Sequence, residues 1–438
     1  APAEPASAAG GCAAADAKDI PSAAEDAVLM ARINTLCWGD GAAAPSAALL
    51  EVQSRWCQGF RFVASEPAAL EQRAGGPCGV IGPVQAFLLR RLLFAPTVED
   101  AGKAINWRCP PDVSAYLTEA LLDMLGQCAR EHQRPIVVAT MAGGGESPDS
   151  VAALHAAVRF TTCSTNTVAK AMLRGALEQY GGPYGVLLFL YSAVATRGVD
   201  IIEGDQGLEL DALISLPFGH ANQSLVNLML IGAAVPHVHD GIQDVGVPLR
   251  GVTEQPEVGY LTLLEQLRYV SVGSLLKNPR HPIWLIGSET HFTVLFSLDR
   301  RLTQAEGPVS RAKRVFTEHD AAGGGFIVPD KLPDVLRELG IVKPEDEMAA
   351  LKVQLGLDVI LLPTFLEALF PGMAADEVPH DFVVYHYNGI ASPGGVVRFS
   401  RGQATAVAPR DFGASPILRV LRTKWSELKC DFDADVKI

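Results

Sequence analysis

The spacing of apolar residues predicts helices in the first third of the chain. From Asp26 onward, apolar side chains recur every three to four residues, and a second stripe of this kind runs through residues 111–132. Pro111 suits the first turn of that second helix, where no backbone N–H is needed. The stripe comprises Val113, Tyr116, Leu117, Leu121, Met124, Leu125 and Cys128. Both segments are therefore expected to bury one face in a core.

Strict alternation of residue types predicts a pair of strands at residues 282–287 and 290–298. In the second strand, one face carries His291, Thr293, Leu295 and Ser297, and the other carries Phe292, Val294, Phe296 and Leu298. The aromatic and aliphatic face is expected to enter the core, which leaves His291 on the more polar face. A further strand pattern follows at residues 382–387.

Between these strand regions, two helices are predicted at residues 311–319 and 332–339. We expect residues 306–372 to form a helical insertion. The main part of the domain then covers residues 26–305, and residues 373–438 complete it. Residues 1–25, mostly Ala, Pro, Ser, Gly and Glu, hold too little apolar surface to fold and are expected to be disordered.

Composition narrows the classes of protein. Hydrophobic residues make up 48% of the chain, charged residues 19%, and the net charge is −13. A nucleic-acid surface would need a basic face, so no nucleic-acid partner is expected. The apolar runs at residues 184–196 and 224–235 are shorter than the roughly 20 residues of a spanning helix, so they are expected to be buried elements, not membrane segments.

The cysteines and the start of the chain bear on the compartment. The eight cysteines form no CxxC pair and no zinc spacing. They are typical of reduced thiols in a reducing compartment. The chain opens with no basic and apolar leader of the secretory type. A cytoplasmic or nuclear location is therefore expected, and no cofactor is expected.

The segment that carries candidate chemistry surrounds Cys78. Two glycines and a proline precede this cysteine, and an apolar helical pattern follows it. A cysteine at a helix N-terminus faces unpaired N–H groups and the positive end of the helix dipole, which favour the reactive thiolate. Pro83 leaves two possibilities open: the helix begins near Gly82, or it begins at the cysteine and contains the proline.

A thiolate nucleophile needs a base and a group that stabilises the oxyanion. Gln72, six residues before Cys78, could donate its side-chain amide, and His291 could take the proton. A cysteine on an early helix and a histidine on a late strand match papain-like folds. By spacing alone, however, the Gly-Gly-Pro-Cys string is more often a structural turn, and a single strand histidine is more often structural.

The surrounding strings resemble the MINDY family, and within it the MINDY-3 branch with an EF-hand-like insertion. The strings, in chain order, are RWCQGFRF at 55–62, ALEQ at 69–72, GGPCGVIGPVQAFLLRRLLF at 75–94, YGVLLFLYS at 184–192, GHANQSLVN at 219–227, GSETHFTV at 287–294, VYHYNG at 384–389 and RTKW at 422–425. The resemblance runs from about residue 30 to residue 425. Several distinct strings in the expected order make it specific.

This resemblance implies a cysteine deubiquitinase with a papain-like α+β fold and a preference for lysine-48-linked polyubiquitin. It implies Cys78 as nucleophile, His291 as general base and Gln72 as oxyanion donor, acting as a thiol-dependent isopeptidase. Ubiquitin and polyubiquitin chains are the expected partners. Asn388 is the candidate for orienting His291; the alternative is an amide bonded to its own turn. A silent ubiquitin-binding scaffold is the alternative function.

Metal binding is not expected. The insertion resembles an EF-hand whose loop is residues 320–331, but the ligand positions 1, 3, 5 and 12 hold Asp320, Ala322, Gly324 and Lys331. Calcium requires oxygen ligands at these positions, so a calcium-responsive scaffold is disfavoured. A second candidate, the HVHD string at residues 237–240, is expected to form a turn or a capped loop and not a metal site.

Overall fold

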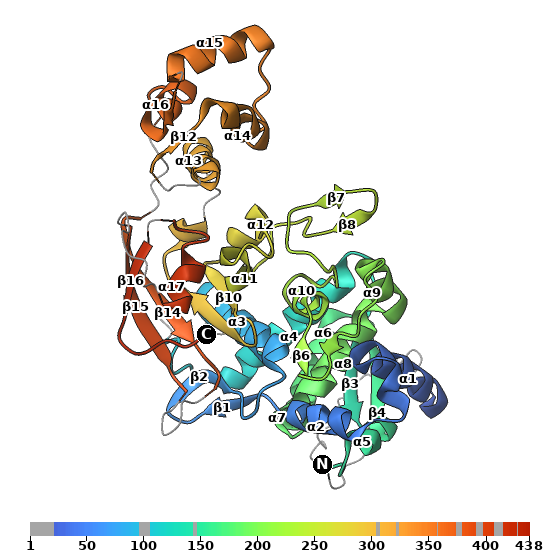
Figure 1. Cartoon of the computed structure of the whole chain (residues 1–438). Coiled ribbons are helices and arrows are strands. Elements are labelled where there is room, and N and C mark those ends of the chain that lie inside the picture. The colour runs from blue at the N-terminus through green and yellow to red at the C-terminus, as the bar shows by residue number, and fades with distance from the viewer. Residues whose placement is uncertain are drawn as a thin grey trace, which may run out of the picture. The chain divides into compact units, whose positions relative to one another are not determined.

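In a computed structural model, the chain divides into two compact units, each described here by itself. The Cys78 unit contains Ala1–His237, Gln243–Gly251 and Gly389–Val397, and the His291 unit contains Val238–Ile242, Val252–Asn388 and Arg398–Ile438. The structure describes residues 22–95, 106–142, 147–303, 307–320, 324–356, 358–373, 379–390, 397–406, 415–426 and 428–438. Figure 1 labels the helices and strands.

The Cys78 unit is mostly helical. Its elements are α1 (Ala23–Trp38), η1 (Asp40–Ala43), α2 (Ala47–Trp56), β1 (Arg61–Val63), β2 (Glu66–Glu71), α3 (Cys78–Phe94), α4 (Val113–Arg130), β3 (Ile136–Met141), α5 (Val151–Ala157), β4 (Val158–Cys163), α6 (Asn166–Gly175), α7 (Leu177–Gly181), α8 (Gly185–Arg197), α9 (Val199–Gln206), β5 (Ile214–Ser215), β6 (His220–Ala221), α10 (Gln223–Ile231) and β8 (Pro248–Arg250). The short strand β7 (Ile242–Asp244) pairs with β8.

The predicted first helix begins three residues before Asp26. Ser22 caps α1 in a capping box: its hydroxyl accepts from the N–H of Glu25, whose carboxylate accepts from the Ser22 N–H. Residues 1–21 of the predicted disordered segment lie outside the described residues. The second predicted helix is α4, capped by Asp112.

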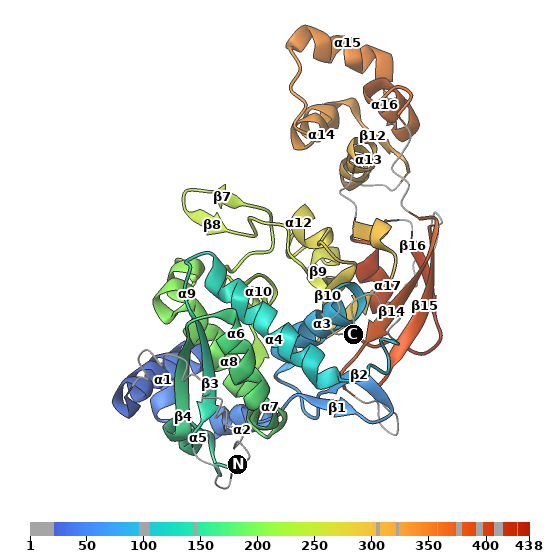
Figure 2. The same ribbon diagram turned by 180° about the vertical axis from the view of Figure 1, so that it is seen from behind.

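The core of the Cys78 unit is built on α3 and α8. Every residue of α8 is buried, as expected for the apolar run at residues 184–196, and the second run forms α10. The antiparallel pair of β3 and β4 lies beside α8 (Figure 2), joined to it by a hydrogen bond from the Val137 N–H to the Thr196 hydroxyl at 2.9 Å. Across the described residues, no single helix has the length and hydropathy of a membrane span; only α8 and α9 pass that test as a pair, bent by 81°.

The His291 unit is organised around a sheet in the order β16-β15-β14-β11-β10-β9. All neighbours are antiparallel except β9 and β10, which run parallel. The elements of the unit are β9 (Gly259–Thr262), α11 (Leu263–Gln266), α12 (Ser274–Lys277), β10 (Ile283–Gly287), β11 (Phe292–Phe296), η3 (Arg300–Thr303), α13 (Pro308–His319), β12 (Phe326–Ile327), η4 (Pro329–Lys331), α14 (Leu332–Glu338), α15 (Glu345–Leu355), β13 (Ile360–Leu361), α16 (Leu362–Leu369), β14 (Asp381–Tyr387), β15 (Phe399–Ala406), α17 (Pro416–Leu421) and β16 (Leu428–Phe432).

Strand β11 corrects one expectation. Its predicted polar face is wrong, because Thr293 and Leu295 are as fully buried as Val294 and Phe296. Leu295 packs in a cluster with α17, while Phe296 stacks on Tyr385 of the neighbouring strand. A strand in the middle of a covered sheet buries both faces, so alternation could not show which face lies inward. His291 itself precedes the strand and is half-buried.

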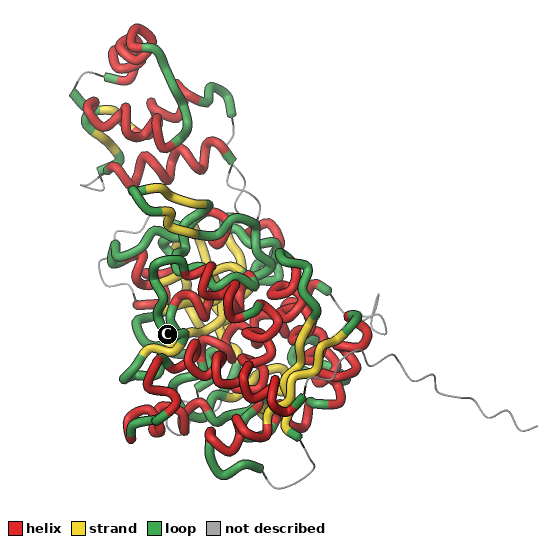
Figure 3. The backbone as a smooth tube through the Cα atoms, turned by 90° about the vertical axis from the view of Figure 1, so that its right-hand side faces the viewer, coloured by secondary structure: helices red, strands yellow, loops and turns green. Residues whose placement is uncertain are grey.

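Residues 308–369 have a hydrophobic cluster of their own. Phe316 of α13 packs on Phe365 of α16 with ring centroids 4.9 Å apart. Strands β12 and β13 pair antiparallel through Phe326 with Leu361 and Ile327 with Ile360. Figure 3 shows helices and strands in both units, and the chain is a mixed α+β protein.

Candidate active site

Cys78 is the first residue of α3, so the helix begins at the cysteine. The Pro77 carbonyl accepts from the N–H groups of Val80 and Ile81, both at 2.9 Å. Pro83 lies inside the helix, and the alternative start near Gly82 is therefore wrong. A thiolate formed at Cys78 would face the positive end of the dipole of a 17-residue helix.

The loop before Cys78 makes a close approach that glycine permits. Gly76 has φ +136°, and a Cβ there would stand 3.0 Å from Nε1 of Trp56. The Cys78 thiol points back along this loop, 3.8 Å from the Gly76 carbonyl oxygen, and is only 2% exposed. Trp56 is fully buried and donates to the Gly219 carbonyl at 3.0 Å, so it is a core residue.

Gln72 directly follows β2 and is 3% exposed. Its backbone N–H donates to the Gly389 carbonyl at 2.8 Å, and its side-chain Nε2 donates to the Ala74 carbonyl at 3.0 Å. An amide nitrogen carries two hydrogens. Ala74 takes one, and within the described residues the second has no protein acceptor. The Gln72 amide can therefore donate one hydrogen bond to a bound oxygen.

His291 is held by a tight turn that starts at Ser288. The Ser288 hydroxyl accepts from the His291 N–H at 3.1 Å, and the Ser288 N–H donates to the His291 carbonyl at 2.9 Å. The imidazole Nε2 lies 3.0 Å from Oδ1 of Asn388, which follows β14. The structure therefore brings the expected orienting residue to His291; its part in catalysis stays a prediction.

A main-chain carbonyl fixes the orientation of the Asn388 amide. Nδ2 donates to the carbonyl oxygen of Lys437 at 3.0 Å, and a carbonyl can only accept. Oδ1 must then be the atom that faces His291, and the Nε2 of His291 must carry a hydrogen to bond it. In the neutral imidazole, the lone pair therefore lies on Nδ1, which is the atom able to accept a proton.

A second histidine, which the sequence did not single out, lies near His291. His386 is 2% exposed, and its Nε2 lies 2.9 Å from the Thr293 hydroxyl. Burial, and then the positive charge of a protonated His291, lower the pKa of His386 to about 3. His386 is thus held neutral near neutral pH. Its only signal in the sequence is its place in the VYHYNG string.

Other cysteines are held as unreactive thiols. Burial raises the pKa of Cys57 to about 11 and that of Cys128 to about 12. Burial, followed by the neighbouring Asp431 carboxylate, also raises the pKa of Cys430 to about 12. Since the thiolate is the nucleophilic form, these side chains are poor candidates for catalysis.

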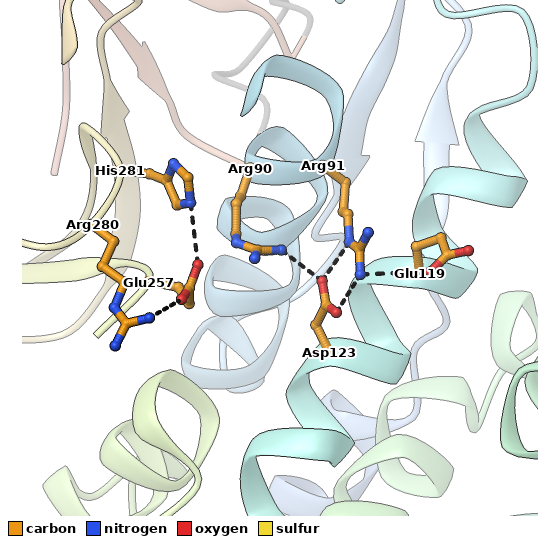
Figure 4. A network of polar contacts seen from close by, with 7 residues as sticks. All are labelled: Arg90, Arg91, Glu119, Asp123, Glu257, Arg280 and His281. Atoms are coloured by element: carbon orange, nitrogen blue, oxygen red, sulfur yellow. Dashed lines mark hydrogen bonds and ion pairs between the residues drawn. The ribbon is translucent and has the colours of Figure 1, made fainter. Parts of the chain in front are cut away.

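Each unit also contains an ion network (Figure 4). In the Cys78 unit, Arg90 donates to Asp123 of α4 at 2.7 Å, and Arg91 pairs with the same carboxylate. These contacts tie the C-terminal half of α3 to α4. In the His291 unit, Glu257 accepts from His281 at 3.1 Å and lies 3.5 Å from Arg280.

The candidate metal positions are used otherwise. Both Asp320 oxygens accept backbone N–H groups, of Gly324 at 3.2 Å and Gly325 at 2.6 Å, while residues 321–323 lie outside the described part. Asp240 of the HVHD string accepts from the N–H groups of Ser274 and Leu275 at 2.8 and 3.1 Å and caps α12. In the part of the chain that the structure describes, no three His, Cys, Asp or Glu side chains gather as a metal site.

The predicted site residues are thus divided between the units: Cys78 and Gln72 lie in one, and His291, bonded to Asn388, lies in the other. Sequence reasoning missed two groups that hold these pairs: Gln58, which bonds the loop after Gln72, and the Lys437 carbonyl. Gln58 stands in the RWCQGFRF string, which was a usable signal. The Lys437 carbonyl belongs to the backbone and leaves no signature in residue type.

Comparison with known proteins gives consistent matches. The conserved domain of deubiquitinating enzyme MINDY-3/4 matches residues 46–316, a span that includes Gln72, Cys78 and His291 but ends before Asn388. The chain is 37% identical over 420 residues to ubiquitin carboxyl-terminal hydrolase MINDY-3 of Bos taurus, covering 87% of this chain and 93% of the relative.

Two more distant relatives extend this picture. The MINDY-3 homolog of Drosophila melanogaster is 32% identical over 464 residues, covering 91% of this chain and 81% of the relative. The probable MINDY-4 hydrolase of Mus musculus is 31% identical over 257 residues, covering 56% and 34%. No solved structure matches the chain.

Proposed function

Since the chain belongs to the MINDY-3/4 family of deubiquitinating enzymes, we propose that it is a thiol-dependent ubiquitinyl hydrolase that cleaves isopeptide bonds of polyubiquitin. One observation supports the chemistry above all others. His291 bonds Asn388 through Nε2, and Asn388 is oriented by Lys437, so the imidazole presents a basic Nδ1. A general base for a thiol nucleophile needs this tautomer.

In the proposed reaction, Nδ1 of His291 removes the proton from the Cys78 thiol. The thiolate attacks the carbonyl carbon of ubiquitin's terminal glycine, and the carbonyl oxygen becomes an oxyanion. The second N–H of Gln72 stabilises this oxyanion, a contribution of typically about 3 kcal/mol for one donor. When the carbon–nitrogen bond breaks, the leaving lysine amine takes the proton from Nδ1, and a thioester remains on Cys78.

Water completes the cycle. His291 removes a proton from a water molecule, the hydroxide attacks the thioester, and the carbon–sulfur bond breaks. The ubiquitin carboxyl group leaves and loses its proton to solvent, and the sulfur recovers a proton from His291. Asn388 keeps the ring in one tautomer through both steps, because its Oδ1 accepts from the Nε2 hydrogen throughout.

The finer features follow from the family resemblance of the sequence. We propose a papain-like arrangement of the catalytic core, a preference for lysine-48-linked chains, and a cytoplasmic or nuclear location. Neither a nucleic acid nor a membrane is proposed as a partner. We propose that residues 306–372, with the β12–β13 pair, are an EF-hand-like insertion that binds no calcium, because Ala322, Gly324 and Lys331 at loop positions 3, 5 and 12 offer no side-chain oxygen ligand. If isothermal titration with calcium gave a heat of binding, the proposed absence of calcium binding would be contradicted.

The decisive experiment uses ubiquitin with a C-terminal electrophile. A covalent adduct located at Cys78 by mass spectrometry, and absent in Cys78→Ala, is the expected result. Cleavage of all linkage types of diubiquitin and longer chains then tests the lysine-48 preference. The competing function, a silent ubiquitin-binding scaffold, would give binding without adduct or cleavage.

A further inference from the structure

Gln58 is a buried glutamine in the segment between α2 and β1, and the mechanism above does not use it. It is 3% exposed and belongs to the Cys78 unit. Its main chain is fixed on both sides, because its N–H donates to the Trp56 carbonyl at 2.8 Å and its carbonyl accepts from Val186 at 2.9 Å. The side chain therefore projects from an anchored backbone.

The Gln58 amide is fully satisfied by backbone groups. Nε2 donates to the carbonyl oxygens of Arg55 at 2.6 Å and Ala74 at 2.9 Å. Oε1 accepts from the N–H of Arg73 at 2.7 Å and, at the longer distance of 3.4 Å, from that of Ala74. A side-chain amide offers two donors and two lone pairs, and all four are used.

These bonds meet at the loop that follows Gln72. The Ala74 carbonyl accepts from Nε2 of Gln58 and also from Nε2 of Gln72, at 2.9 and 3.0 Å. Two amides thus converge on one oxygen. Gln58 sets the position of that oxygen, and the oxygen sets the direction of the Gln72 amide.

The same short segment supports the rest of the loop. Trp56, two residues before Gln58, lies against Gly76, two residues before Cys78. The loop from Gln72 to Cys78 therefore rests on residues 56–58 at both ends. We propose that Gln58 is a positioning residue that aims the second N–H of Gln72 at the oxyanion. The inference rests on the proposed function.

Three substitutions of Gln58 separate donation from acceptance. Gln58→Glu keeps an acceptor for Arg73 and Ala74 but can no longer donate to the Ala74 carbonyl. Gln58→Met keeps the volume and removes every hydrogen bond, and Gln58→Ala removes the side chain. Gln179→Ala is the matched control, because the Gln179 side chain also bonds a backbone N–H and C=O, both of Met141 in β3, at 2.8 and 3.3 Å. Among the described residues, it makes no hydrogen bond to the loop at residues 72–78.

We expect Gln58→Glu and Gln58→Met to lower kcat for cleavage of a ubiquitin amide by roughly 10- to 100-fold, with KM within about 2-fold. This loss is part of the 10²- to 10³-fold that follows removal of an oxyanion donor. Alkylation of Cys78 by iodoacetamide should proceed at the wild-type rate, because that displacement forms no oxyanion. Gln179→Ala should keep wild-type kcat.

The double variant provides the sharper test. If Gln58 acts through Gln72, then Gln58→Glu should lower kcat no further once Gln72→Ala is in place. Three results would overturn the inference. The first is a double variant in which the two losses of kcat multiply. The others are a wild-type kcat in both Gln58→Glu and Gln58→Met, or a fall in kcat of the same size in Gln179→Ala. A slowed alkylation would also overturn it, since Gln58 would then act on Cys78. The wild-type protein tests the proposed function separately. If it forms the adduct and cleaves ubiquitin, the proposed function stands whatever the Gln58 variants show. If it does neither, the proposed function itself is contradicted.

Discussion

The two units orient a functional carboxamide by the same device but protect it differently. In the Cys78 unit, the Gln72 amide bonds the Ala74 carbonyl, and in the His291 unit, the Asn388 amide bonds the Lys437 carbonyl. Ala74 is clamped by the buried Gln58. Lys437 is exposed, and its segment is held by the packing of Val436 and Ile438 against the sheet's hydrophobic cluster.

The orientation of the Gln72 amide thus depends on buried hydrogen bonds, whereas that of the Asn388 amide depends on a hydrogen bond at the surface. A buried hydrogen bond is stronger, and its loss leaves unsatisfied groups, whereas water competes for an exposed one. The side-chain amide of Gln72 should therefore be held in one orientation, whereas that of Asn388 should reorient more easily. Four predictions test this comparison, in order of decreasing effect.

The largest effect is expected from removing either reacting group. Cys78→Ala and His291→Ala should each lower turnover of a ubiquitin amide by about 10⁴-fold or more, because residues that act as one catalytic unit fail together. Circular dichroism should show both variants folded. If His291→Ala and the wild type had comparable turnover, His291 would not be the general base.

The next largest effect concerns Asn388. Asn388→Ala should lower kcat by about 10²-fold, since the base loses its fixed tautomer. Asn388→Asp should retain more activity than Asn388→Ala, because a carboxylate still accepts from Nε2 of His291, although it cannot donate to Lys437. Nitrogen chemical shifts of the His291 side chain report the tautomer directly. A dominant Nδ1–H form in the wild type would disprove the assignment.

A smaller effect is expected from the Lys437 carbonyl. Removing residues 437 and 438 deletes one exposed hydrogen bond, worth about 1 kcal/mol, together with the packing of Ile438, and loss of that hydrogen bond should shift the ratio of the two amide orientations by roughly 5-fold. The loss in kcat should be of that order. Lys437→Ala is the matched control, since it keeps the carbonyl and removes only the side chain. Equal losses in both variants would show that the side chain, not the carbonyl, matters.

The smallest effect is expected on stability at low pH. Each unit contains a histidine whose pKa is lowered, His155 in one and His386 in the other. Burial lowers the pKa of His155 in the Cys78 unit to about 4 and that of His386 to about 3, where the charge on His291 also contributes. Both values lie below the roughly 6.5 of the unfolded chain, so below that pH the unfolded state binds more protons. Stability is therefore full above pH 6.5 and falls as the pH drops toward 4 or 3.

Each histidine should contribute a slope of at most about 1.4 kcal/mol per pH unit. Urea unfolding measured from pH 7 to pH 4 should show this slope in the wild type. His155→Gln and His386→Gln should each reduce the slope by up to the amount that one bound proton contributes. An unchanged slope in both variants would mean that neither histidine is held neutral in the folded protein.

Much of the fold follows from local patterns. The capped helix α1, the stripe of α4, the buried α8 and the strands β10, β11 and β14 lie where apolar spacing predicts them. Local spacing succeeds for these elements because a helix or strand is stabilised by neighbours three, four or two residues away. It failed for the faces of β11, because burial of both faces depends on strands and helices that are distant in the chain.

By itself, the sequence determined the helix that begins at Cys78 as one of two options, the candidate residues Gln72 and His291, and the family. The tertiary structure alone decided which groups hold them: Gln58 on Ala74, Gly389 on the Gln72 N–H, and Lys437 on Asn388. The physical reason is that a hydrogen bond between residues as far apart as 291 and 388 leaves no periodic trace in the chain. Only folding brings a carbonyl to an amide and so selects which nitrogen of a histidine is the base.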